Sequence, residues 1–284
     1  MSQTLSLQEA NRINDLDGKT WTKLTKSWFI INPKPRTERE LTHPAKFPIE
    51  IPRRFIRLFS RKQQTVFDPF CGCGTTLYAA RGLGRNGIGI ELNEGWVEYI
   101  RTQLTQTTLI EPVWQEVIHG DARELTSLLN SHFAGNIPQL DLCITSPPYW
   151  KILRDSGTGR CDTQAKDRIA TGLPTDYGDD PRNLELVDDY QEFLYGLVAI
   201  FRQIHKLLRD RGFLVIIVQN LRNTEDKQVY PLAWHLGLAL GRFFELKREQ
   251  LWCQANKSVG LHGFPTSYIS NVHHHYCLIF QKTK

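Results

Sequence analysis

The chain of 284 residues contains no apolar run that approaches the roughly 18 uninterrupted residues of a membrane-spanning helix. Its start, MSQTLSLQEANRIND, also lacks the apolar segment of a secretory signal peptide. These absences argue against a membrane partner and against secretion. We therefore expect an intracellular, cytoplasmic protein.

Cysteine is scarce and scattered, with six residues in the whole chain. Their spacing matches neither a disulfide framework nor a zinc site, so we expect reduced thiols. The cysteines stand at positions 71, 73, 143, 161, 253 and 277.

An apolar content of 40% and a charged content of 23% are typical of one globular α/β domain, which we expect to cover residues 1–284. We find no internal repeat, low-complexity segment or interdomain linker. Strand candidates alternate with amphipathic helical segments, which predicts a mostly parallel sheet of seven strands with helices on both faces. The last two strands are joined by a Gly/Pro-containing loop, so they should form a C-terminal antiparallel hairpin. The expected strands are 65–70, 87–92, 116–120, 140–145, 213–218, 246–254 and 275–281, and the expected helices are 75–83, 95–104, 123–130, 190–208 and 231–241.

Two regions do not fit this predicted core. Residues 1–45 form an aromatic, basic lead-in, and residues 151–185 form a polar insertion of a length that suggests ligand binding or disorder. The net charge is +5, and basic residues gather at 34–39 and 53–62 and at Arg81 and Arg85. Such clusters permit phosphate contacts but are also typical of solvated surfaces.

The first strong strand ends in a glycine-rich turn, DPFCGCGTT, at residues 68–76. Gly72 and Gly74 let the backbone pass close to a ligand at the carboxyl edge of the sheet, where open α/β folds bind cofactors. Glu91 ends the next strand, 23 residues after Asp68, where a carboxylate can accept hydrogen bonds from both ribose hydroxyls. The spacing therefore predicts a nucleoside-containing cofactor.

Two absences narrow the choice of cofactor. The turn is not Gly-x-Gly-x-x-Gly, because residue 77 is leucine, and the chain has no Gly-Lys-Ser/Thr phosphate loop, so pyrophosphate binding is disfavoured. Asp121 follows the third strand, where it could receive an adenine amino group or cap a helix. In series, Asp68, Glu91 and Asp121 outline a site for the amino acid, ribose and adenine of S-adenosylmethionine.

A rigid polar-aromatic peptide, TSPPYW, occupies residues 145–150 after the apolar run of the fourth strand. Two prolines fix φ at about −65° and lack backbone donors, which leaves the carbonyls of Ser146 and Pro147 free to accept hydrogen bonds. Acceptors beside the ring of Tyr149 suit a flat heterocycle with an amino group, such as an exposed nucleobase. The same run is also compatible with an ordinary strand-ending turn.

With DPFCGCGTT, GIGIEL, HGD and TSPPYW in that order, the chain resembles the amino-group DNA methyltransferases, the bacterial N4-cytosine and N6-adenine enzymes. Residues 42–48 (THPAKFP) resemble the family segment that closes the methionine end of the cofactor pocket, although a plain connector would look the same. The lead-in KSWFIINPKPR is similar to the N-terminal arm of such enzymes in restriction-modification systems, and the tail FPTSYISNVHHHYCLIFQK to their closing hairpin.

The resemblance covers nearly the whole chain and implies a Rossmann-like S-adenosylmethionine-dependent methyltransferase fold. It implies double-stranded DNA as the substrate, a cognate restriction endonuclease as a candidate partner, association with the bacterial nucleoid, and no metal. Target recognition would fall to residues 151–185 or to the loops 221–230 and 255–272. The expected cofactor contacts are His43, Pro44, Asp68, Pro69, Phe70, Gly72, Gly74, Thr75, Glu91, Leu92 and Asp121, and the expected catalytic residues are Ser146, Pro147, Pro148 and Tyr149.

The implied reaction is direct methyl transfer to the exocyclic amine of a flipped base. Hydrogen bonds from the amine to Ser146 and to the Pro147 carbonyl would favour the pyramidal geometry needed for attack, and Tyr149 would stack on the base. SPPY resembles mostly N4-cytosine enzymes, and a hydroxyl acceptor avoids burying a charge. We therefore expect N4-cytosine as the acceptor, with N6-adenine as the alternative.

Rival chemistries have weaker support. C5-cytosine methylation requires a thiolate nucleophile, but Cys71 and Cys73 lie in the cofactor turn and no Pro-Cys dipeptide occurs. His273 to His275 could suggest a metal, yet alternate residues of a strand point to opposite faces, which favours a structural strand end. Methylation of RNA or of a protein glutamine, and a non-catalytic binding module, are the remaining alternatives.

Overall fold

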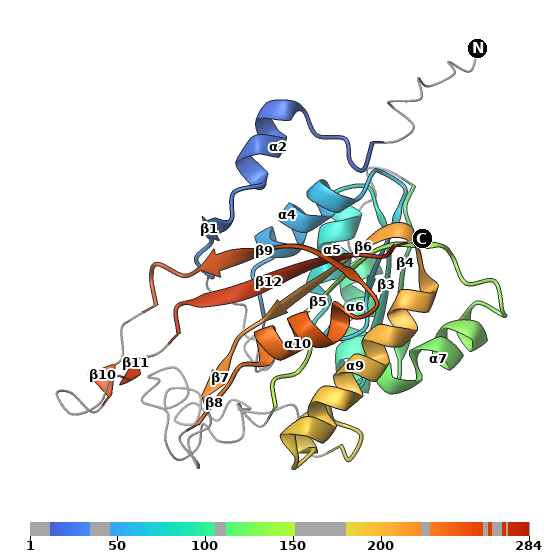
Figure 1. The fold of residues 1–284 in the computed structure, drawn as a ribbon. Helices are drawn as coiled ribbons and strands as arrows, with labels where there is room; N and C mark the ends of the chain where they lie inside the picture. Colours follow the sequence, from blue (N-terminus) through green and yellow to red (C-terminus); the bar gives the residue numbers. More distant parts are fainter. Residues whose placement is uncertain are drawn as a thin grey trace.

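One eight-stranded sheet organises the computed structural model, which describes residues 12–34, 46–105, 112–150, 180–222, 228–257, 261–262, 269–270 and 272–283 (Figure 1). Strand β12 is antiparallel to both of its neighbours, whereas every other pairing in this sheet is parallel. The strand order is β1-β9-β12-β6-β5-β2-β3-β4. The strands are β1 (Trp28–Ile30), β2 (Thr65–Asp68), β3 (Asn86–Glu91), β4 (Gln115–His119), β5 (Leu140–Thr145), β6 (Leu208–Val218), β9 (Glu245–Cys253) and β12 (His274–Gln281).

The strand order reverses between β2 and β5, which lie side by side although two strands separate them along the chain. Such a reversal is the topological switch point of a doubly wound α/β sheet, where the carboxyl ends of the strands border a ligand crevice. All seven expected strands are present, and β9 and β12 form the expected C-terminal hairpin. The predicted Rossmann-like fold is therefore confirmed.

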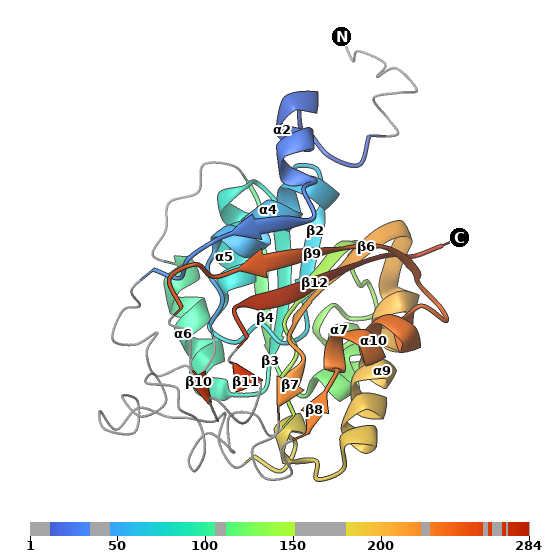
Figure 2. The same cartoon turned by 60° about the vertical axis from the view of Figure 1, so that its left-hand side comes forward.

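Helices cover both faces of the sheet, as Figures 1 and 2 show. Strands β2 and β5 are buried along their whole length, as expected for central strands of a parallel sheet that is covered on both faces. On one face lie α4 (Glu50–Phe59), α5 (Thr75–Gly82) and α6 (Glu94–Thr105), and on the other lie α7 (Leu125–His132), α9 (Tyr190–Leu207) and α10 (Leu232–Leu240). No helix in the described part of the chain is long and apolar enough to span a membrane.

The N-terminal lead-in departs from the expectation that it lies outside the core. Residues 28–30 form β1, an eighth strand that pairs in parallel with β9. Phe29 points inward and packs against Phe55 of α4, with ring centroids 6.2 Å apart, and the indole of Trp252 donates to the carbonyl of Ile31 at 2.7 Å. A strand of three residues is too short for sequence periodicity to reveal it.

Short elements complete the described fold. The lead-in also contains α2 (Gly18–Leu24), which packs against α4. Strands β7 (Leu221–Arg222) and β8 (Val229–Tyr230) form one antiparallel ladder, and β10 (Leu261–His262) and β11 (Ile269–Ser270) form another. Two 3₁₀ turns, η1 (Ala122–Glu124) and η3 (Leu184–Leu186), precede α7 and α9.

We predict that Gly89→Ala destabilises the protein by about 1 to 3 kcal/mol, because the added methyl group overpacks a tight site. A Cβ at Gly89 in β3 would lie 2.8 Å from the sulfur of Cys71 and 3.1 Å from Leu77. The matched control is Gly237→Ala in α10, where a Cβ meets nothing within 4 Å. There the better helix propensity of alanine should stabilise by about 0.5 to 1 kcal/mol in urea unfolding. Equal effects of the two substitutions would contradict the close approach of the turn to β3.

Candidate active site

The glycine-rich turn between β2 and α5 is bound to the end of the neighbouring strand β3. The amide of Cys71 donates to the carbonyl of Ile90 at 3.0 Å, and the amide of Gly72 donates to the Glu91 carboxylate at 2.8 Å. Gly72 and Gly74 have φ values of 53° and 86°, in the left-handed region that favours glycine. The turn is therefore held over the carboxyl edge of the sheet by one backbone hydrogen bond and by one hydrogen bond to the Glu91 carboxylate.

Asp68, the last residue of β2, lies beneath this turn and is 1% exposed. Its Oδ2 accepts from the hydroxyl of Thr76 at 2.6 Å, and its Oδ1 accepts from the hydroxyl of Thr145 at 2.7 Å and from the amide of Phe70 at 3.1 Å. The carboxylate thus connects β2 to the start of α5 and to the end of β5. Burial raises the pKa of Asp68 to about 6, although these hydrogen bonds oppose the rise.

Glu91 ends β3 beside the turn and remains partly exposed. Its two carboxylate oxygens accept from the amides of Gly72 at 2.8 Å and Asn93 at 2.9 Å. Withdrawal of the carboxyl group from water raises its pKa to about 7. Among the described residues, neither Glu91 nor Asp68 has a lysine or arginine partner. Two carboxylates that are costly to ionise and lack a protein cation suit a cationic ligand.

Asp121 follows β4 at the same edge of the sheet and is 8% exposed. It is the N-cap of η1, where Oδ1 accepts from the Arg123 amide at 2.9 Å, and Oδ2 pairs with the Arg123 guanidinium at 2.6 Å. Arg123 also donates to the carbonyl of Arg182 at 3.0 Å. Asp121 therefore caps η1, and its contact with adenine stays a prediction. The end of the 151–185 insertion lies beside Arg123, just after β4.

The remaining expected cofactor residues fall into two groups. Thr75 is buried at the start of α5, with its hydroxyl 3.6 Å from the sulfur of Cys73, while Pro69 is buried and Phe70 and Leu92 are partly exposed. His43 and Pro44 lie outside the described residues. The turn residues therefore surround one edge of the sheet, and the expected closing segment is not placed.

The peptide Ser146-Pro147-Pro148-Tyr149 begins directly after β5, next to the switch point. Pro147 is buried, whereas the other three residues are partly exposed, and the hydroxyls of Ser146 and Tyr149 lie 3.5 Å apart. Burial raises the pKa of Tyr149 above its ordinary value, so the phenol is neutral near neutral pH. The peptide thus places two neutral hydroxyls near the glycine-rich turn.

Trp150, which was not among the expected site residues, fixes the far end of this peptide. It is 7% exposed, and its indole donates to the carbonyl of Val187 at 2.9 Å. Its ring contacts Tyr190 of α9 and Tyr230 of β8, with centroids 5.2 Å and 4.7 Å away. Tyr190 in turn forms a hydrogen bond of 2.8 Å with Nδ1 of His235. Only the aromatic pair Tyr149-Trp150 in the sequence could have indicated this anchor.

The three consecutive histidines lie at the start of β12. His275 stacks on Trp252 with ring centroids 4.3 Å apart, and burial lowers the pKa of His275 to about 3. Gln219, which follows β6, donates to the carbonyl of His274 at 2.7 Å. Within the described ranges, no group of three or more His, Cys, Asp or Glu side chains could hold a metal. These contacts are those of a packed strand end.

The described structure thus combines a doubly wound sheet with a glycine-rich turn, the carboxylates of Asp68 and Glu91, and a proline-containing peptide at the switch point. Residues 5–102 match the model of the N6/N4 methyltransferase family, described as DNA methylase. The Type II methyltransferase M.MjaI of Methanocaldococcus jannaschii is 50% identical over 70 residues, 24% of this chain and 22% of its own length. M.BglI of Bacillus subtilis is 37% identical over 87 residues, which are 30% of this chain and 24% of M.BglI. M.HindIII of Haemophilus influenzae is 45% identical over 53 residues, which are 19% of this chain and 17% of M.HindIII.

Over these segments the chain is similar to DNA methylases of the N6/N4 family and to Type II methyltransferases. The matched segments span less than a quarter of the length of these relatives. Solved structures similar to the chain include a putative rRNA methylase from Clostridium thermocellum, with a TM-score of 0.46 and 14% identity over 84% of this chain and 98% of that one. A putative DNA modification methylase from Thermus thermophilus has a TM-score of 0.37 and 22% identity, and the match covers 58% of this chain and 52% of that one. The family match ends before residues 146–149, so the role of that peptide stays a prediction.

We predict that the Asp68→Asn variant loses less stability than the wild type as the pH rises. Because the folded-state pKa of Asp68 is raised from 3.8 to about 6, its contribution to the free energy of unfolding is complete below about pH 4 and is lost as the pH rises through about 6. Asparagine can still bond Thr76 and Thr145 but does not ionise. The wild type should therefore lose free energy of unfolding on the order of 3 kcal/mol across this pH range through Asp68, and the variant should not. Urea unfolding at several pH values measures the difference, and the contribution of Glu91 is the same in both proteins. A wild-type decline that persists unchanged in Asp68→Asn would show that Asp68 does not ionise at this cost.

Proposed function

We propose that the protein transfers a methyl group from S-adenosylmethionine to the exocyclic N4 amine of a cytosine flipped out of duplex DNA, as the modification enzyme of a restriction-modification system. The observation that carries the proposal is the hydrogen bond of 2.7 Å between Asp68 and Thr145. It joins the cofactor turn to the residue that precedes Ser146. A donor held by that turn and an acceptor held by Ser146 to Tyr149 would meet at one edge of the sheet.

The described residues fit the proposed cofactor. S-adenosylmethionine is a sulfonium cation that supplies the methyl group, and S-adenosylhomocysteine is its leaving product. Asp68 and Glu91 offer negative charge without a neighbouring lysine or arginine, so a bound cation would favour their ionised forms. The ribose would lie against Glu91 and the adenine near Asp121, with Gly72 and Gly74 leaving the backbone open to close approach.

The acceptor amine would be held by neutral groups. Ser146 Oγ and the carbonyl of Pro147 would accept hydrogen bonds from the two amine protons, which favours the pyramidal nitrogen needed for in-line attack. Tyr149 would stack on the base, a contact worth about 1 to 3 kcal/mol. The raised pKa of Tyr149 excludes its phenolate from the role of base near neutral pH.

Cytosine is preferred over adenine because the first residue of the peptide is serine. A serine hydroxyl can accept from the cytosine amine without placing a second charge beside Asp68, which is itself costly to ionise. Duplex DNA is the proposed partner, and a cognate endonuclease would cut the unmodified target. The proposed recognition segments, 151–185, 221–230 and 255–272, lie largely outside the described residues.

We expect N4-methylcytosine in DNA that has been incubated with the protein and S-adenosylmethionine, measured by mass spectrometry of the released nucleosides. Ser146→Ala and Pro147→Ala should each lower the rate, and loss of the serine hydrogen bond should cost about 10- to 100-fold. Ser127→Ala is the matched control, because Ser127 is exposed on α7 and, among the residues the structure describes, its hydroxyl bonds only the local carbonyl of Glu124.

The same experiment separates the alternatives. N6-methyladenine without N4-methylcytosine would overturn the choice of base but not the reaction. Methyl incorporation into RNA or protein, with none into DNA, would overturn the proposed substrate. Full activity in both Ser146→Ala and Pro147→Ala would remove the acceptor role from this peptide.

A further inference from the structure

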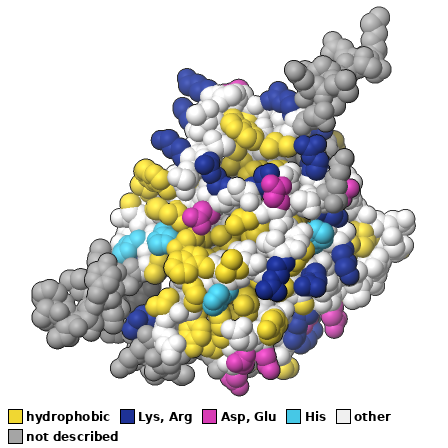
Figure 3. All heavy atoms as spheres, viewed as in Figure 1, with side chains coloured by type: hydrophobic (Ala, Val, Ile, Leu, Met, Phe, Trp, Pro, Cys, Tyr) yellow, Lys and Arg dark blue, Asp and Glu magenta, His cyan; other side chains and the backbone are white. Residues whose placement is uncertain are grey.

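The positive charge of the protein is concentrated in one part of the chain. Residues 12–34 and 46–62 contain eleven Lys and Arg against three Asp and Glu, whereas the net charge of the whole chain is only +5. Figure 3 shows these cationic side chains gathered over α2 and α4 at the top of the view. We call the surface formed by residues 18–26, which include α2, and by α4 the basic face.

The three acidic residues of this part of the chain are engaged in local contacts. Asp17 caps α2 by accepting from the amide of Thr20 at 2.9 Å, and Glu50 forms an ion pair of 3.0 Å with Lys34. Asp15 pairs with Arg85 at 3.2 Å and accepts from the amide of Lys62 at 3.1 Å. Each carboxylate is therefore used for structure.

Five exposed cations of the basic face have no carboxylate within ion-pair distance among the described residues. In the described part of the chain, the side chains of these residues make no hydrogen bond or ion pair. Their mutual repulsion destabilises the folded protein slightly unless a polyanion binds. The five are Lys19, Lys23, Lys26, Arg53 and Arg57.

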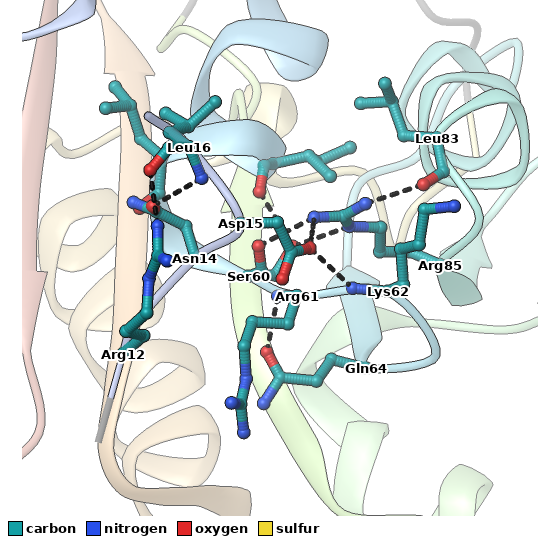
Figure 4. A network of polar contacts seen from close by, with 12 residues as sticks. Arg12, Asn14, Asp15, Leu16, Ser60, Arg61, Lys62, Gln64, Leu83 and Arg85 are labelled. Carbon is teal, nitrogen blue, oxygen red and sulfur yellow. Dashed lines mark hydrogen bonds and ion pairs between the residues drawn. The ribbon is translucent and has the colours of Figure 1, made fainter. Parts of the chain in front are cut away.

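The basic face has a fixed backbone. Asn14 donates to the carbonyl of Leu58 at 2.6 Å, next to the contacts of Asp15 with Arg85 and Lys62 (Figure 4). At the other end of α2, Arg54 donates to the carbonyl of Leu24 at 2.6 Å. The lead-in is thus bound to α4 at both ends of α2, so the cations project from a preformed surface.

One end of the basic face, the N-terminus of α4, lies at the edge of the sheet that carries the candidate active site, whereas α2 lies beside the other end of α4 (Figure 1). Lys34 follows β1 at the carboxyl edge and pairs with Glu50, the first residue of α4. From there α4 leads away from the edge, with Arg53 and Arg57 one turn apart, about 6 Å along its axis. A long polyanion held at the edge could therefore continue over α4.

We infer that the basic face binds the phosphate backbone of duplex DNA outside the target sequence. This inference rests on the proposed function and adds to it a contact that is independent of sequence. Lysine and arginine side chains that neutralise phosphates release counterions from the DNA. Each such contact therefore steepens the slope of log binding constant against log salt concentration by about 0.9. The contact should raise affinity and association rate without changing the chemical step.

The test compares two triple variants with the same change in net charge. Lys23→Gln/Arg53→Gln/Arg57→Gln removes three cations of the basic face, and Arg202→Gln/Lys206→Gln/Arg242→Gln removes three exposed cations on α9 and after α10, on the opposite side of the sheet. Binding of the full chain to a fluorescent duplex of roughly 40 base pairs is measured between about 50 and 200 mM KCl. Methyl incorporation is measured in the same samples.

We expect the slope of log Kd against log salt to fall by about 2 to 3 in the basic-face variant and to be unchanged in the control. The rate at saturating DNA should equal that of the wild type, and Arg53→Lys/Arg57→Lys should keep the wild-type slope. Equal slopes in the two triple variants, with wild-type methylation intact, would overturn this inference alone. Selective loss of binding to phosphatidylserine vesicles, with unchanged DNA binding, would also overturn it by identifying a lipid surface. Absence of wild-type methyl transfer to DNA would instead count against the proposed function.

Discussion

The arrangement of the candidate site depends on one buried carboxylate. Asp68 ends β2, and its two oxygens bind the hydroxyls of Thr76 in α5 and Thr145 in β5. Those partners belong to the glycine-rich turn and to the strand that leads into Ser146, the two segments that the proposed methyl transfer would align. Because β2 and β5 are adjacent only at the topological switch point, this connection is available at no other pair of strands in the described sheet. A single side chain thus connects the two segments proposed to hold the methyl donor and the acceptor base.

This arrangement has a cost in stability. Burial raises the pKa values of Asp68 and Glu91 to about 6 and about 7, and neither group has a protein cation within the described structure. Their ionised forms are therefore less favourable in the folded protein than in water, as expected for a site organised around a charged ligand rather than for its own stability. The basic face shows a related imbalance, because the described part of the chain holds more exposed cations there than carboxylates. Under the proposed function, binding of the cofactor and of DNA would each stabilise the folded protein.

The sequence predicts the parts that depend on local chemistry. The glycine turn, the carboxylates at the strand ends and the proline peptide each follow from residues close together in the chain. What it could not supply are contacts between distant segments. The bond from Thr145 to Asp68 joins residues 77 positions apart, and Trp150 is fixed by Val187, Tyr190 and Tyr230. The strand β1 was missed for a different reason, since three residues carry no period and their pairing with β9 is decided by packing of Phe29 on α4. The sequence left two roles for Asp121, a helix cap or a contact with adenine. Its contacts with Arg123 show that it caps η1, and they are compatible with the contact with adenine as well.

The most direct test of the alignment by Asp68 is the rate of methyl transfer in Thr145→Val compared with Thr145→Ser. Valine keeps the shape of threonine but removes the hydroxyl that donates to Asp68, whereas serine keeps the hydroxyl. The account predicts that Thr145→Val lowers the rate at saturating cofactor and DNA by about 10- to 100-fold, the effect of one lost hydrogen bond to a charged group, and that Thr145→Ser stays close to the wild type. A Thr145→Val protein that folds and transfers methyl groups at the wild-type rate would contradict it.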